Sequence, residues 1–137
     1  MEPKKVLLIG SNPSIRSPDA SPFHVSTRSR IILDAWFDGL GTLERAYLNV
    51  SPIQKEDNKP LTKAEINTAV PLLLERLKSY QGYKVIALGK TAAYACSKLN
   101  ISYLEMPHPS GLNRQLNDPA FVEEKIKRLV EFINQPS

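Results

Sequence analysis

The segment KKVLLIG, residues 4–10, holds the continuous apolar run Val6-Leu7-Leu8-Ile9 and ends at Gly10. An apolar run without polar alternation is typical of a strand whose two faces are both buried. The segment KVIALG, residues 84–89, also predicts a strand, and Gly89 permits a tight exit from it. The first segment in particular favours a sheet that helices cover on both sides.

Outward from these segments, the chain alternates between strands and helices. Strands are expected at residues 4–9, 46–50, 84–88 and 102–106. Strands that alternate with helices form parallel sheets with right-handed crossovers. The pattern therefore predicts an α/β fold in three layers, α/β/α, with a central four-stranded parallel sheet. The expected strand order is 2-1-3-4. A single domain over residues 1–137 is expected, because this length suits one core.

Capping residues and glycines mark the ends of the first expected helix. Ser26 or Thr27 can cap its start, and Gly39 with Gly41 ends it. Helical spacing predicts that its apolar face holds Ile31, Ile32, Ala35 and Trp36.

Three further helices follow. The second opens on the capping box at residues 62–65, continues to residue 77 and contains Pro71, which is expected to kink or divide it. The third is expected at residues 90–99. The fourth starts at an N-cap and first-turn pair, Asp118-Pro119, and runs to about residue 133.

Composition limits the class of protein. Eighteen Lys and Arg against fourteen Asp and Glu give a net charge of +4, compatible with a polyanionic partner or simply with a solvated basic surface. The single cysteine, Cys96, excludes an internal disulfide, and a small buried core residue is expected there. The two histidines lack the spacing of a zinc site, so no metal is expected. The apolar run near the N-terminus is too short for a signal peptide or a membrane span, so a cytoplasmic protein without a membrane partner is expected.

Two polar loops each follow an expected strand directly. They are GSNPS at residues 10–14 and HPSGLNR at residues 108–114. In parallel α/β sheets the ligand crevice lies at the carboxyl ends of the strands. The two loops are therefore expected at one edge of the sheet, where an amide, an imidazole, two hydroxyls, a leucine and an arginine would form a site.

At these residues the chain resembles the uracil-DNA glycosylase superfamily. Residues 10–14 are similar to its water-activating motif, in the Asn-containing form of the mismatch-specific uracil/thymine branch, and residues 108–112 are similar to its DNA-intercalation motif. Ser21-Pro22-Phe23 resembles the segment with the base-stacking Phe, and Leu48-Asn49-Val50 the segment with the base-reading Asn. Residues 84–93, KVIALGKTAA, resemble the thermostable, iron–sulfur branch. That branch uses four cysteines and this chain has one, so no cluster is carried over.

The resemblance implies roles for individual residues. Asn12 would hold the attacking water and His108 would donate a hydrogen bond to the departing base, as the two catalytic residues. The implied base-binding residues are Gly10, Ser11, Phe23 and Asn49. The implied DNA-binding residues are Ser14, Lys90, Ser110, Gly111, Leu112 and Arg114, with Leu112 as the wedge that fills the gap left by a flipped base.

Each of these side chains also has a purely structural interpretation. Asn12 can stabilise an Asn-Pro turn, and Asn49 can be a polar strand end bonded to a loop. His108 can be satisfied by backbone groups, and Phe23 can belong to the core. Leu112 can be one of the exposed leucines that proteins commonly carry.

The resemblance implies a monofunctional DNA glycosylase of base excision repair. It would act without a cofactor, as a monomer, on DNA that contains uracil or a related deaminated base. A second hypothesis is a DNA-binding protein of the same fold that is catalytically weak or inactive. A third is a flavodoxin-like enzyme acting on a nucleotide or phospho-ligand, but residues 10–14 match neither a Gly-x-Gly-x-x-Gly motif nor a P-loop.

Overall fold

The computed structural model describes residues 4–11, 27–41, 43–51, 61–109 and 114–135. Four parallel strands form one sheet in the order β2-β1-β3-β4, which confirms the predicted topology. The strands are β1 (Lys4–Gly10), β2 (Leu43–Asn49), β3 (Lys84–Leu88) and β4 (Tyr103–Met106). β2 starts earlier than predicted, because it pairs with β1 along its whole length from Leu43 onward.

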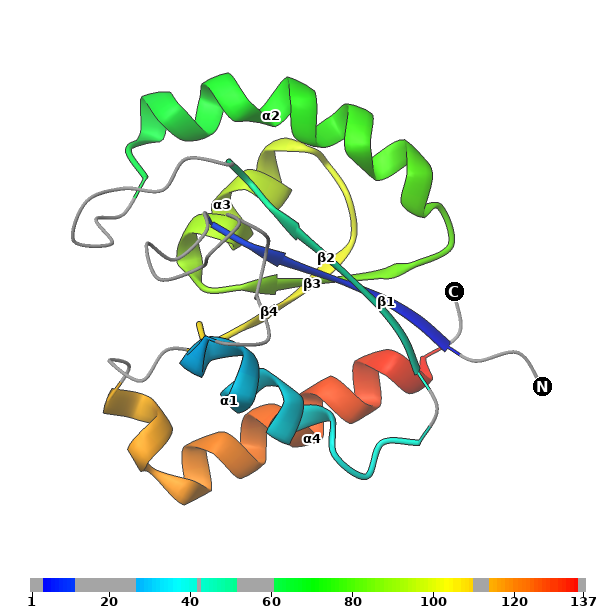
Figure 1. Ribbon diagram of the computed structural model, residues 1–137, viewed down its shortest axis with the longest axis vertical. Helices are drawn as coiled ribbons and strands as arrows, with labels where there is room; N and C mark the ends of the chain where they lie inside the picture. The colour runs from blue at the N-terminus through cyan, green and yellow to red at the C-terminus, as the bar shows by residue number, and fades with distance from the viewer. Residues whose placement is uncertain (1–3, 12–26, 42, 52–60, 110–113, 136–137) are drawn as a thin grey trace.

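Helices cover both faces of the sheet (Figure 1). They are α1 (Arg28–Phe37), α2 (Lys63–Leu77), α3 (Lys90–Lys98) and α4 (Pro119–Asn134). Two short 3₁₀-helices that the sequence did not predict are η2 (Lys78–Tyr80) and η3 (Arg114–Asn117). The three-layer α/β/α architecture is therefore confirmed.

The central strand β1 divides the core into two layers. Leu7 and Ile9 pack with side chains of α2 and α3, whereas Val6 and Leu8 pack with side chains of α1 and α4. All four side chains have no exposed surface, as the uninterrupted apolar run predicted. Cys96 lies in the layer with α2 and α3 and is buried, which confirms the core interpretation.

The predicted apolar face of α1 was partly wrong. Trp36 is buried as expected, but Ile31 is 65% exposed and Ala35 is also exposed. The core side chains are instead Leu33, Trp36 and Phe37. Successive helical residues point about 100° apart, so Ile31 lies nearly opposite Leu33. The segment is apolar on several sides, and contacts with the sheet select the face that is buried.

The predicted helix caps are present. Thr27 accepts a hydrogen bond from the Arg30 amide at 3.3 Å. In the capping box of α2, Thr62 and Glu65 exchange side-chain to backbone hydrogen bonds at 2.8 and 3.2 Å. Asp118 caps α4.

α2 continues through Pro71 rather than being divided there. Ile66 and Leu73, on either side of the proline, are both buried in the core. These contacts hold the two halves against the sheet, which offsets the hydrogen bond that proline cannot donate.

Candidate functional site

The carboxyl edge of the sheet continues its hydrogen bonding beyond the strand ends. Gly10 and Asn49 are register partners at the last position of β1 and β2. The Val50 amide then donates to the Gly10 carbonyl at 2.9 Å, and the Ser51 amide donates to the Ser11 carbonyl at 3.0 Å. The first residues of both following loops are therefore held in place by backbone hydrogen bonds.

Two polar side chains are buried at the end of β2. Asn49 is 6% exposed and Ser51 is 3% exposed. Burying polar side chains costs free energy unless hydrogen bonds compensate, so polar residues at such positions need a specific reason. Strand alternation places Asn49 on the same face as Tyr47, which packs in the layer of α1 and α4.

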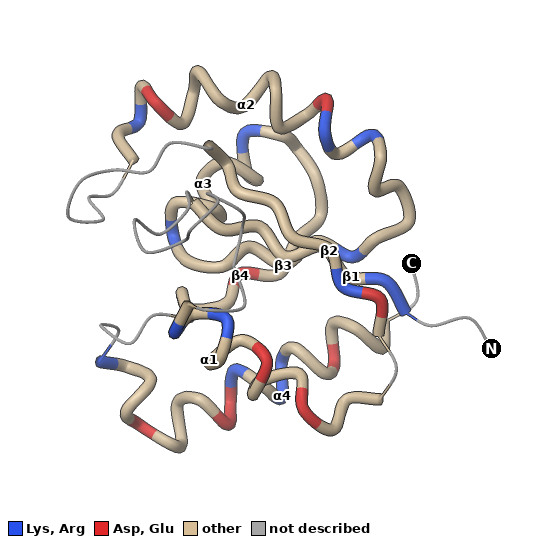
Figure 2. Tube along the Cα trace, viewed as in Figure 1, with Lys and Arg blue, Asp and Glu red and all other residues tan. Residues whose placement is uncertain are grey.

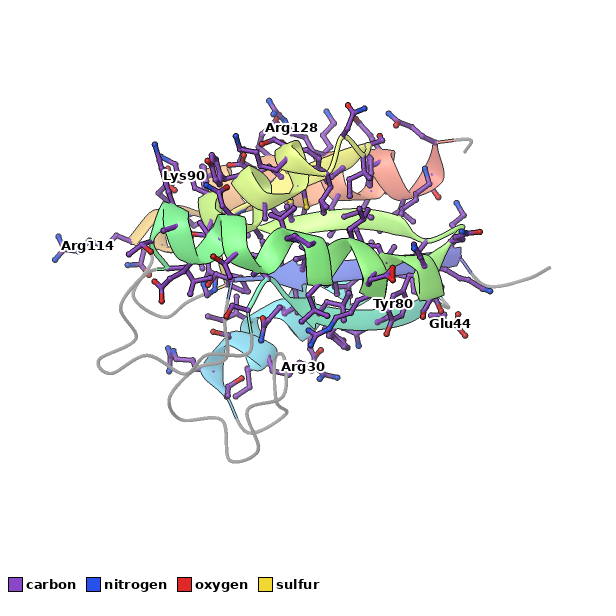
Figure 3. All side chains as sticks on the ribbon, turned by 90° about the horizontal axis from the view of Figure 1, so that it is seen from above. Arg30, Glu44, Tyr80, Lys90, Arg114 and Arg128 are labelled. Atoms are coloured by element: carbon purple, nitrogen blue, oxygen red, sulfur yellow. The ribbon has the colours of Figure 1, made fainter. Side chains whose placement is uncertain are left out.

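The start of α1 is attached to β2 close to Asn49. The Arg30 guanidinium lies 4.6 Å from the centre of the Tyr47 ring, and Figure 3 shows Arg30 projecting from α1. Asp34 joins Arg30 and Arg45 through one carboxylate oxygen, 2.9 Å from each guanidinium. Desolvation opposes ionisation of Asp34, but the hydrogen bonds from both arginines prevail and lower the pKa of Asp34. This charged cluster therefore fixes α1 against the strand that carries Asn49.

His108 lies at the end of β3, although it follows β4 in the sequence. The Gly89 amide donates to the Met106 carbonyl at 2.8 Å, which connects the ends of β3 and β4. A Cβ atom added to Gly89 would lie only 3.1 Å from His108 Cβ and 3.5 Å from Cδ2 of its ring. Pro109, directly after the histidine, is fully buried. The loop after β4 therefore turns back over β3 and presents His108 above Gly89.

Burial determines the protonation state of this histidine. Desolvation lowers the pKa of His108 below its ordinary value of 6.5. The imidazole is therefore neutral at pH 7, with one nitrogen as donor and the other as acceptor. A neutral imidazole can donate a hydrogen bond without adding a buried charge.

Exposed cations collect at the same edge. Arg28, Lys63 and Lys90 are the first residues of α1, α2 and α3, and Arg114 is the first residue of η3. In a parallel sheet, the helix after each strand starts at the carboxyl edge, and Figure 3 shows Lys90 and Arg114 at the end of the molecule opposite Glu44. The tube view shows the basic starts of the helices at this end (Figure 2).

None of these four cations forms an ion pair in the part of the chain that the structure describes. Some cations elsewhere have partners: Lys5 lies 3.9 Å from Glu44, and Lys84 donates to two carbonyls at the end of α4. The positive end of a helix dipole disfavours a cation in the first turn. An anion bound at this edge would compensate for that repulsion.

The sequence profile of the Uracil DNA glycosylase superfamily matches residues 2–130. The chain belongs to this superfamily. Its members are typically monofunctional DNA glycosylases, so membership points to a DNA substrate and to excision of uracil or a related base. No curated protein sequence matches the chain significantly.

The structure brings together six of the site residues expected for a uracil DNA glycosylase superfamily member. They are Gly10, Ser11, Asn49, Lys90, His108 and Arg114, all at the carboxyl edge of the sheet. The other six lie outside the described residues: Asn12, Ser14, Phe23, Ser110, Gly111 and Leu112. The intercalation and water-activating motifs are thus described only at their first residues.

Two cations and one contact at this edge were missed in the sequence. Arg28 and Lys63 could have been found by asking which residue begins each helix, since the caps Thr27 and Thr62 were recognised. The contact between Gly89 and His108 has no local sequence signal, because it joins two different strand ends.

Three further findings concern a membrane span, a metal site and a reactive thiol. No helix in the described ranges is long and apolar enough to cross a membrane. Among these residues there is also no group of three or more His, Cys, Asp or Glu side chains able to hold a metal ion. Burial raises the pKa of the Cys96 thiol to about 12, so this buried side chain is not a thiolate nucleophile at neutral pH.

Proposed function

We propose that this superfamily member is a monofunctional DNA glycosylase. It hydrolyses the N-glycosidic bond of uracil, or of a related deaminated base flipped out of DNA, and leaves an abasic site. The observation that carries the proposal is the pairing of a neutral His108, seated on Gly89, with a buried Asn49 at the same edge of the sheet.

The spacing of these two residues suits one flipped base. His108 lies over the end of β3 and Asn49 ends β2, with β1 between them. Two strand spacings amount to about 10 Å. That span accommodates one pyrimidine ring with a hydrogen bond of about 3 Å at each end. Gly10, at the end of β1, has no side chain to obstruct the space between them.

The two side chains have complementary tasks. The Asn49 amide offers a donor and an acceptor, which match O4 and N3–H of uracil; cytosine presents the opposite pattern. When the C1′–N bond breaks, its electron pair stays on the base, and a hydrogen bond from neutral His108 to the base carbonyl stabilises that anion. Phe23 stacks on the flipped ring, and stacking is tolerant of base identity.

Asn12 holds the water that attacks C1′. An amide orients water through hydrogen bonds but accepts a proton poorly, so the water loses its proton only as it bonds to the sugar cation. The reaction is therefore expected to be slower than with a carboxylate at this position. Attack by water needs neither a metal ion nor a lysine imine.

The DNA backbone runs across the edge that carries the exposed cations. Lys90 and Arg114 bind phosphates together with the hydroxyls of Ser14 and Ser110, and such contacts position the strand without reading sequence. Leu112, after Gly111, enters the helix where the base has left.

One experiment tests the function directly. The protein, in excess, is incubated with labelled oligonucleotides that contain uracil, hypoxanthine, xanthine or a G·T mismatch, followed by alkali treatment that cleaves abasic sites. Cleavage at the modified position is expected, with uracil among the substrates. If no oligonucleotide is cleaved while the protein still binds it, the chain is a DNA-binding member of the superfamily rather than a glycosylase.

Two variants test the roles of the proposed catalytic residues. Asn12→Ala and His108→Ala are expected to retain DNA binding and lose product. Product formed at the wild-type rate by both variants would contradict the assigned roles, even if the wild-type protein is a glycosylase.

A further inference from the structure

Gly89 differs from the other glycines with a left-handed backbone in the described part of the chain. Gly39, Gly41, Gly82 and Gly89 all have positive φ angles, between +81° and +94°. A Cβ atom added to any of the first three would meet nothing within 4 Å. At Gly89 the three nearest atoms would all belong to His108, at 3.1 Å for Cβ, 3.5 Å for Cδ2 and 3.7 Å for Cγ.

We propose that Gly89 is a positioning residue for His108. Because Gly89 has no side chain, the side chain of His108 packs directly against it, and this contact sets the distance between the imidazole and a bound base. The inference rests on the proposed function of His108, but the contact itself can be tested without catalysis.

The backbone around Gly89 is held from several directions. Its amide donates to the Met106 carbonyl at 2.8 Å, and its carbonyl accepts from the Ala93 amide at 3.1 Å in the first turn of α3. Gly89 therefore cannot move away from the histidine without breaking the junction of β3, β4 and α3.

His108 has equally little freedom to withdraw. Met106 is 1% exposed and Pro109 is fully buried, so both sides of the histidine are anchored in the core. A methyl group at Gly89 would sit closer to His108 than most real Cβ contacts, and the neighbour would have to shift by a few tenths of an ångström. Because the closest atom is the His108 Cβ, which side-chain rotation does not move, the shift displaces His108 as a whole and carries the imidazole with it.

The proposal predicts different effects for two matched variants. Gly89→Ala and Gly82→Ala both place a Cβ on a backbone with positive φ, at +94° and +88°. Gly89 also has ψ 169°, a combination that essentially only glycine adopts, so Gly89→Ala carries backbone strain of its own. Only Gly89→Ala also touches His108. The contact itself is isolated by comparing Gly89→Ala in the wild-type and His108→Gly backgrounds, because the strain at residue 89 is then the same and only the opposing side chain differs.

The first measurement is NMR of the histidine rings. The chain has two histidines, His24 and His108, so a His24→Asn variant leaves one set of ring signals. In that background, Gly89→Ala is expected to shift the ¹⁵N and ¹³C signals of the His108 ring, whereas Gly82→Ala leaves them unchanged. Unshifted signals in a folded Gly89→Ala protein would overturn the proposal.

The second measurement is excision of uracil from duplex DNA. Gly89→Ala is expected to lower kcat by about tenfold, because small displacements of catalytic groups are costly, with KM nearly unchanged. Gly82→Ala is expected to keep the wild-type kcat. A change in KM alone, or the same loss of kcat in both variants, would contradict a positioning role.

A third variant covers the case in which Gly89→Ala does not fold. Gly89→Ala/His108→Gly removes the opposing side chain and is expected to fold, because Gly89→Ala should lower the thermal midpoint less in the His108→Gly background than in the wild type. If it is as unstable as Gly89→Ala alone, His108 is not the obstacle and the proposal is wrong. If the wild-type protein excises no base at all, the proposed function is wrong. The NMR and stability measurements then still test whether His108 packs against Gly89.

Discussion

Removing two of the exposed cations at the carboxyl edge is expected to weaken the salt dependence of DNA binding by a calculable amount. Arg28 and Lys63 are exposed, begin two different helices and have no ion pair among the described residues. If each neutralises one phosphate, each contributes about 0.9 to the slope of log K against log salt concentration. The double variant Arg28→Gln/Lys63→Gln should therefore reduce the magnitude of the slope by about 1.8.

The size of this effect is measurable. A slope change of about 1.8 means that, over a fourfold rise in salt, the variant loses about 12-fold less affinity than the wild type. Fluorescence anisotropy of a labelled duplex with an abasic-site analogue, between about 50 and 200 mM salt, resolves this difference. Contacts made by other residues contribute equally to both proteins and cancel in the comparison.

A control pair removes the same charge elsewhere. Arg76 and Lys127 also have no ion pair in the described part of the chain, but neither begins a helix, since Arg76 lies in the last turn of α2 and Lys127 lies within α4. Arg76→Gln/Lys127→Gln should leave the slope nearly unchanged. Equal slopes for the two double variants would refute the assignment of the carboxyl edge as the DNA-binding surface.

Stability provides an independent check on the same variants. A cation in the first turn of a helix is disfavoured by the helix dipole by about 0.3–1 kcal/mol. Arg28→Gln/Lys63→Gln should therefore be at least as stable as the wild type in urea denaturation. A loss of affinity in a protein that is not destabilised cannot be ascribed to unfolding.

Four other predictions concern single residues. Asn12→Asp should raise the excision rate by about 10²-fold, because a carboxylate can act as general base, and an unchanged rate in single-turnover kinetics would argue against a water-holding role. Because burial lowers the pKa of His108, the folded state resists protonation, so the free energy of unfolding should fall as the pH drops below 6.5 toward the lowered pKa. In urea titrations, the free energy of unfolding of His108→Asn should fall less over that pH range than that of the wild type. An equal fall would contradict the assignment of this pH dependence to His108. Thr62→Ala, which removes an N-cap, should cost about 1 kcal/mol in urea denaturation, more than Thr68→Ala within the same helix. Leu112→Ala should excise normally from single strands but poorly from duplex DNA; equal rates on both would exclude a wedge.

The sequence was most informative where structure depends on neighbouring residues. The apolar run at residues 6–9 predicted a fully buried central strand, and the segment 84–88 predicted β3 with its exact bounds. Thr27, Thr62 and Asp118 cap helices as predicted, because a cap is a hydrogen bond within one turn. Where several faces of one helix are apolar, as in α1, the local sequence pattern did not identify the face that is buried.

The sequence by itself determined the existence of the strands, the helix starts and the superfamily resemblance, since these depend on periodicity and short motifs. The tertiary structure decided that α1 buries Leu33 rather than Ile31, because Leu33, Trp36 and Phe37 together pack against the sheet. It also decided that His108 rests on Gly89, and that the exposed cations of separate helices share one edge. Each of these features joins residues that are distant along the chain, and only the packing of helices on a parallel sheet brings them together.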